Sequence, residues 1–167
     1  MRVTAISITL LSLIGSISAR TLDDPDEFTS LGCPATTNAN ASPAEQLAAW
    51  EDFADLLYIR KSPRDALLKY AAAGYINHAP HVPESGRDNA IDYLSRNKGS
   101  NTVQLRHVYI GFDKNGTTYA TAHFQATPEN GNSSASVDIS RMVGSCLVEH
   151  WEAGQKMDPS DNPIAYF

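Results

Sequence analysis

The sequence predicts an α+β domain in which helices pack on one face of an antiparallel sheet. Apolar residues recur at helical spacing in the first half of the chain, whereas the second half alternates apolar and polar residues as strands do. Helices followed by a meander of strands are typical of the α+β class. With 167 residues, the chain is long enough for one such domain with a hydrophobic core.

The first helix is expected from Pro43 to about Arg60, because Ser42 can cap it and Pro43 suits its first position. A second helix is expected from Pro63 to near Gly74, and a third over residues 87–96. Between them, residues 75–78 read as a short extended piece. The folded domain is therefore expected to span residues 43–157, with a tail at 158–167.

Four strands are expected in the second half. Residues 103–112 and 119–126 alternate around an Asn115-Gly116 turn, which favours a tight hairpin. Residues 137–155 form a second hairpin around Gly144-Ser145. This second hairpin carries an unusual number of ionisable residues among strand formers: Asp138, Glu149, His150 and Glu152.

The N-terminus has the features of a secretory signal. Residues 1–19 contain a basic residue, an apolar stretch and a small-residue cleavage region that ends at Ala19. We therefore expect a secreted chain that begins near Arg20 and has no membrane segment after the signal is removed. Residues 20–42 are polar, lack periodicity and predict a flexible extension that is held in place only if Cys33 is bonded.

The charge limits the partners. The formal net charge is −6, and it becomes more negative when the signal and its Arg2 are removed. An acidic chain of this kind argues against nucleic acid and anionic membranes as partners.

Two features follow from secretion. Cys33 and Cys146 are the only cysteines, and an oxidising compartment favours a disulfide between them, with two buried free thiols as the alternative. Sequons at Asn115 and Asn132 lie in expected turns and are candidate glycosylation sites. The sequon at Asn40 is weaker because Pro43 follows it.

Asp138 is the first candidate for chemistry. Aspartate is disfavoured in the middle of a strand, so its presence needs a reason. It either lies on the solvent face of the sheet or faces a cavity as an acid or base, and the spacing alone leaves both interpretations open.

Two segments resemble one family. The pattern Val-Asp-Ile-Ser-Arg at 137–141, with Val-Glu-His-Trp-Glu at 148–152, is similar to the C-terminal hairpin of SnoaL-like polyketide cyclases in the NTF2-like superfamily. The block Tyr-Ile-Asn-His-Ala-Pro at 75–80 resembles a second motif of that family. The resemblance covers roughly residues 43–155. It implies a curved sheet wrapped into a cone, with an apolar pocket between sheet and helices.

The resemblance also implies roles. Family members use a pocket aspartate as the acid or base of an aldol-type ring closure, without cofactor or metal, and Asp138 matches that position. His123, one strand earlier, is the expected partner of Asp138. Further residues are expected around the pocket, with His150 placed there as a wall residue: Trp50, Tyr58, His78, His107, Tyr119 and His150.

Two functions are compatible with these observations. The first is a cofactor-independent enzyme, an aldol-type cyclase, isomerase or dehydratase, that acts on a small apolar carbonyl compound. The second is a non-catalytic module that binds a small apolar ligand or forms a dimeric interaction surface. A homodimer fits both. The sequence leaves open whether the chain is an enzyme.

Overall fold

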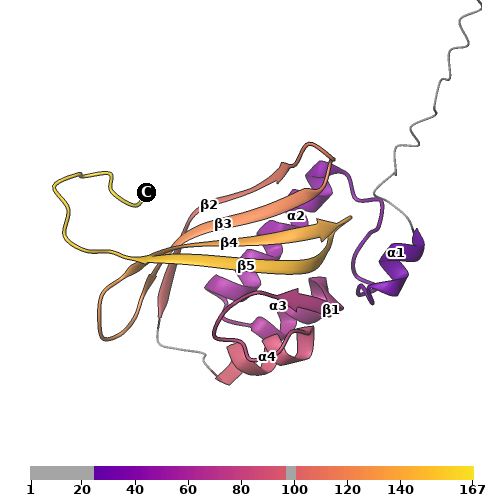
Figure 1. Cartoon of the computed structure of the whole chain (residues 1–167), viewed down its shortest axis with the longest axis horizontal. Coiled ribbons are helices and arrows are strands. Elements are labelled where there is room, and N and C mark those ends of the chain that lie inside the picture. The colour runs from indigo at the N-terminus through magenta and orange to yellow at the C-terminus, as the bar shows by residue number, and fades with distance from the viewer. Residues whose placement is uncertain (1–24, 97–100) are drawn as a thin grey trace, which may run out of the picture.

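A computed structural model describes residues 25–96 and 101–167, and the expected signal at 1–19 lies outside the described residues. Five strands form one curved sheet in the order β1-β5-β4-β3-β2 (Figure 1). Their bounds are β1 Ala71–Asn77, β2 Thr102–Phe112, β3 Thr118–Thr127, β4 Ser134–Val143 and β5 Cys146–Lys156.

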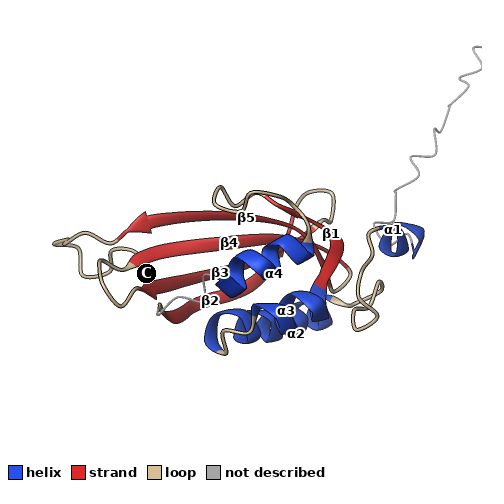
Figure 2. Ribbon diagram, turned by 90° about the horizontal axis from the view of Figure 1, so that it is seen from below, coloured by secondary structure: helices blue, strands red, loops and turns tan. Residues whose placement is uncertain are grey.

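The main helices lie together on one face of this sheet (Figure 2). A capping box begins α2, since Ser42 accepts from the Glu45 amide and the Glu45 carboxylate accepts from the Ser42 amide. The helices are α2 Pro43–Ala54, which continues as a π-helical stretch η1 Asp55–Ile59, α3 Pro63–Tyr70 and α4 Arg87–Arg96. The short α1, Pro25–Ser30, lies apart at one end of the sheet. The expected α+β class, with helices packed on one face of a curved sheet, is confirmed.

The first strand departs from the expected arrangement. The helix expected to reach Gly74 ends at Tyr70, and β1 begins at Ala71 and runs parallel to β5. The alanines at 71 and 72 are fully buried in this strand, and Ala73 donates its amide to the Gly32 carbonyl at 2.9 Å. The sheet is therefore mixed. Helical spacing could not reveal this pairing, because its partner strand lies about 75 residues further along the chain.

Two hydrophobic clusters hold the layers together. The larger lies between helices and sheet and includes Trp50, Phe53, Leu67 and Phe124. The smaller lies on the other side of the β1–β5 edge, where Val143, Cys146 and Val148 join Ala72 beneath the N-terminal segment. None of the helices in the described part of the chain has the length and apolar character needed to span a bilayer.

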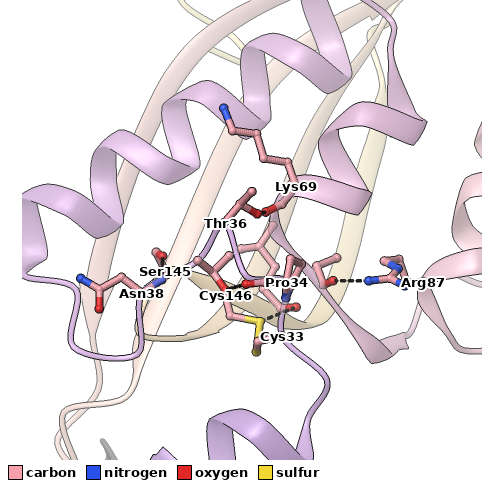
Figure 3. Close-up of a disulfide and its surroundings, with 11 residues drawn as sticks. Cys33, Pro34, Thr36, Asn38, Lys69, Arg87, Ser145 and Cys146 are labelled. Carbon is pink, nitrogen blue, oxygen red and sulfur yellow. Dashed lines mark hydrogen bonds between the residues drawn. A yellow bond between two sulfur atoms is a disulfide. The ribbon is translucent and has the colours of Figure 1, made fainter.

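The N-terminal segment is bonded to the turn of the β4–β5 hairpin (Figure 3). Cys33 and Cys146 form the expected disulfide across a sequence separation of 113 residues. Beside it, the amide of Asn38 donates to the Ser145 hydroxyl at 2.8 Å, and the Ser145 amide donates back to the Asn38 carbonyl at 3.0 Å. The segment from Cys33 onward is thus fixed against the hairpin. The sequence predicted this only for the case in which Cys33 is bonded, and a flexible extension otherwise.

Candidate functional site

A cavity of about 810 Å³ opens between the helices and the concave face of the sheet. Its apolar wall comes from α2, α3 and β3, with Trp50, Leu67 and Phe124 as large members. Its polar wall comes from the middle of β4 and β5, where Asp138, His150 and Glu152 line the cavity. An apolar hollow with a few convergent polar groups is the usual form of a small-molecule site.

Asp138 faces this cavity and not the solvent side of the sheet. It pairs with Ala122 on β3 and Glu152 on β5, and Ala122 is buried in the core beneath the helices. Directly paired residues of antiparallel strands share a face of the sheet. Only 13% of the Asp138 side chain is exposed.

Tyr58 is the closest partner of that carboxylate. Its hydroxyl, carried by η1, donates to Asp138 Oδ2 at 2.5 Å. Burial, and then the negative charge of Asp138, raise the pKa of the Tyr58 hydroxyl well above its usual range. Tyr58 is therefore a neutral phenol that donates its hydrogen bond to Asp138. Burial likewise raises the pKa of Tyr75 on β1, which lines the same cavity.

His150 is the second partner. Its Nε2 lies 3.5 Å from Asp138 Oδ2, and its Nδ1 lies 3.1 Å from Asn77 Oδ1. The ring also stacks against Tyr75, with centroids 6.3 Å apart. The imidazole is thus held on two edges and one face, with 12% of the side chain exposed. A carboxylate and an imidazole, Asp138 and His150, therefore lie next to each other in the wall of the cavity.

Glu152 completes a group of three. Donor atoms of Asp138, His150 and Glu152 lie within 4.8 Å of one another, and this is the one such group among the residues that the structure describes. A metal ion, if this protein binds one, would be held here. The same three groups also suit proton transfer without a metal, which is the chemistry that the sequence predicted.

The structure does not bring Asp138 and His123 together. His123 pairs with Val137, the residue before Asp138, and so its side chain lies on the opposite, outer face of the sheet. There it stacks on His107, with ring centroids 5.6 Å apart, and contacts the tilted ring of Phe167, with centroids 4.8 Å apart. Strand alternation correctly groups His123 with Tyr119 and Thr121, but it cannot tell which face of the sheet is concave.

The expected pocket residues divide between the two faces. Trp50, Tyr58 and His150 line the cavity. His78, His107 and Tyr119 do not line it. His78 stacks on Trp151 on the outer face and bonds Glu149 through Nε2 at 2.9 Å. Tyr119 lies close to the same Trp151, with ring centroids 6.4 Å apart.

Sequence reasoning did not predict how three residues contribute to the site. Tyr75 and Asn77 reach it through the parallel β1–β5 pairing, which local spacing does not show. Glu152 was recognised only as part of a motif, although its position two residues after His150 puts both on one face of β5. That spacing is the one signal in the sequence that could have found it.

Comparisons with known proteins give the fold. No family model matches the chain, and a search of curated proteins found no match. Several solved structures do match. An NTF2-like protein of unknown function from Mesorhizobium loti is 19% identical, with a TM-score of 0.55, and the match covers 68% of this chain and 94% of that one.

Two further structures carry names that suggest activities. A candidate ketosteroid isomerase from Kribbella flavida DSM 17836 is 15% identical over 71% of this chain and 83% of that one, with a TM-score of 0.53. A candidate polyketide cyclase from Bacillus cereus ATCC 10987 is 13% identical over 73% and 87%, with a TM-score of 0.51. At such identities the likeness concerns architecture, and this chain has the NTF2-like fold.

Proposed function

We propose that this protein is a cofactor-independent acid–base enzyme that acts on a small apolar carbonyl compound. One observation carries the proposal: the Asp138 carboxylate lies in the wall of an apolar cavity, bonded by Tyr58 and close to His150. A carboxylate that has fixed neighbours and is mostly shielded from solvent is suited to taking and returning a proton. Its catalytic partner is His150 rather than His123.

The chemistry balances within one substrate molecule. Asp138 takes a proton from the carbon next to the carbonyl, so that the C–H bond breaks and an enolate forms. In an aldol-type closure, the enolate carbon forms a bond to a second carbonyl carbon of the same molecule. The alkoxide that results takes the proton back from Asp138. In an isomerisation, the proton returns to a different carbon instead.

Hydrogen exchange tests the proposal whatever the final product is. The protein would be incubated in D2O with a panel of small cyclic ketones and diketones, and deuterium beside the carbonyl would be measured by mass spectrometry. We expect exchange that Asp138→Asn lowers by about 100-fold or more. Ligand affinity should persist in this variant, because amide and carboxylate have the same shape.

His123→Gln is the matched control, since that histidine lies on the other face of the sheet. It should leave exchange unchanged. Binding of panel ketones without any exchange in the parent protein would refute the enzymatic proposal and favour a small-ligand binding module. Extraction of a co-purified molecule, followed by native mass spectrometry, would then identify the ligand class.

The proposal includes secretion. The Cys33–Cys146 disulfide supports an oxidising compartment, and the two candidate glycosylation asparagines, Asn115 and Asn132, lie in loops between strands. Removal of N-linked glycans from protein secreted by a eukaryotic host should lower its mass at these two sites. A homodimer through the outer face is part of the same proposal, because Tyr109 and Ile139 are exposed there.

A further inference from the structure

The end of β1 meets the middle of β5 at the edge of the cavity. In this parallel pair Asn77 lies beside His150, and the amide of the next residue, His78, donates to the His150 carbonyl at 2.9 Å. The backbone pairing therefore fixes how the two side chains approach each other. His150 Nδ1 and Asn77 Oδ1 are 3.1 Å apart.

A second hydrogen bond fixes the orientation of the Asn77 amide. Asn77 Oδ1 also accepts from the backbone amide of Ala79 at 3.0 Å. If the amide were turned over, its NH₂ group would face that backbone N–H, and two donors would oppose each other. The atom that meets His150 is thus an oxygen, which accepts and cannot donate.

The ring nitrogen of His150 that meets this oxygen must therefore be a hydrogen-bond donor. Nδ1 of His150 therefore carries a proton, and in the neutral ring Nε2 is left with its lone pair. Nε2 points toward Asp138, but the 3.5 Å between Nε2 and Oδ2 is longer than a normal hydrogen bond, so the carboxylate does not hold a proton on Nε2. A proton that Asp138 takes from a ligand can pass to Nε2, which gives an imidazolium beside a carboxylate, and can return by the same route without any net change.

We propose that Asn77 is a positioning residue: it holds His150 in the tautomer that carries its proton on Nδ1, so that Nε2 faces Asp138 and the cavity as the proton-exchanging atom. Its meaning for catalysis rests on the proposed function. The tautomer itself is a property of the resting protein. The two claims can therefore fail separately.

Nuclear magnetic resonance of protein labelled with ¹⁵N-histidine tests the tautomer with no substrate present. The His150 signals would be assigned by their loss in His150→Gln, and the ring would be observed in its neutral form. We expect the proton on Nδ1 in the parent. Asn77→Ala should move it largely to Nε2, the form that an unconstrained neutral imidazole prefers.

Two variants sharpen the test. Asn77→Asp keeps an acceptor for both the Ala79 amide and Nδ1, and should keep the parent tautomer. Ser85→Ala is the control and should also keep it, because the Ser85 hydroxyl bonds the backbone of Asn77 and not its side chain. A proton on Nε2 in the parent, or an unchanged tautomer in Asn77→Ala, would overturn the proposal. Should Asn77→Ala not fold, a proton on Nε2 in the parent or in Asn77→Asp would still overturn it.

Activity separates positioning from the proposed function. If the parent catalyses exchange, Asn77→Ala should lower the rate by about 10-fold or more with ligand affinity retained, and Asn77→Asp should restore most of it. A parent with the expected tautomer but no exchange would refute the enzyme and leave the positioning role intact. An active parent whose rate is unaffected by Asn77→Ala would refute positioning alone.

Discussion

The β4–β5 hairpin builds two regions of opposite character. At its turn, Gly144, Ser145 and Cys146 are buried beneath the N-terminal segment and bonded to it. A few residues along the same two strands, Asp138 and Glu152 face an open cavity with ionisable side chains next to each other. The turn is buried and its polar groups are bonded, whereas the cavity wall is open and carries ionisable side chains.

The turn stabilises the fold, whereas the cavity wall presents the side chains of the candidate site. The closed turn binds the first part of the chain to the last, so changes there should reduce the free energy of unfolding. The cavity wall places like charges directly opposite each other, an arrangement that costs stability and is typical of functional sites. Substitutions in the two regions should therefore differ in sign as well as in size.

Loss of the disulfide is the strongest way to break the closed region. The cross-link spans 113 residues, for which the chain-entropy model gives about 5 kcal/mol of stabilisation. Replacement of Cys33 and Cys146 together by alanine should lower the free energy of unfolding by about 3–5 kcal/mol in urea titrations. The reduced parent is the control and should fall by a similar amount. A loss below about 1 kcal/mol would mean that the remaining contacts hold the turn alone.

Gly144→Ala perturbs the same turn and leaves the disulfide in place. Gly144 has φ +52°, and a Cβ here would collide with the Asn38 carbonyl oxygen and lie 2.6 Å from that of Ala39. Unfavourable backbone geometry and overpacking together predict a loss of about 2–5 kcal/mol.

Gly111→Ala on β2 is the matched control for this glycine. A Cβ at Gly111 meets nothing within 4 Å, so the change should alter stability by no more than about 0.5 kcal/mol. Equal effects of the two substitutions in thermal unfolding would show that the turn is not tightly covered.

The two regions also differ in how far the sequence predicted them. Both cysteines, the Gly144-Ser145 turn and the alternation of β4 follow from local rules, which is why the closed turn was predicted well. Asp138 was found because an aspartate is out of place in mid-strand.

The sequence placed Tyr58 and His150 at the pocket but did not predict their contacts with Asp138, because these contacts depend on distant pairings. His150 meets Asn77 only because β1 runs parallel to β5, and Tyr58 reaches Asp138 across 80 residues of chain. Strand proximity favoured His123, but adjacent positions on the paired strand point to opposite faces. The concave face is decided by helix packing, which spacing within strands does not record.

Glu149 lies between the two regions and faces outward. Burial alone would raise the pKa of its carboxyl, but hydrogen bonds from His78 and Arg141 outweigh this and hold the pKa below its ordinary value of 4.5. The folded protein therefore binds this proton less readily than the unfolded chain does. Its stabilisation is fully present above about pH 4.5 and is lost as the pH falls through the folded-state pKa.

Glu149→Gln should remove this contribution. We expect a loss on the order of 1 kcal/mol at pH 7 and a shallower fall in stability between about pH 5 and 3, measured by urea titration at several pH values. Glu129→Gln, in the exposed β3–β4 loop, is the control and should leave the acid dependence as in the parent. A parallel shift of the whole pH curve in Glu149→Gln would contradict the linkage.

Glu152→Gln gives the smallest expected effect and tests the charged wall directly. Glu152 lies opposite Asp138 across the β4–β5 ladder, and neutralising one of two facing carboxylates should leave stability unchanged or raise it by up to about 0.5 kcal/mol. Because the effect is electrostatic and Glu152 is exposed, added salt should shrink it, which urea titrations at two salt concentrations would show. A loss of about 1 kcal/mol or more would instead make Glu152 a structural partner. The cavity wall would then resemble the closed turn, and the contrast between the two regions would fail.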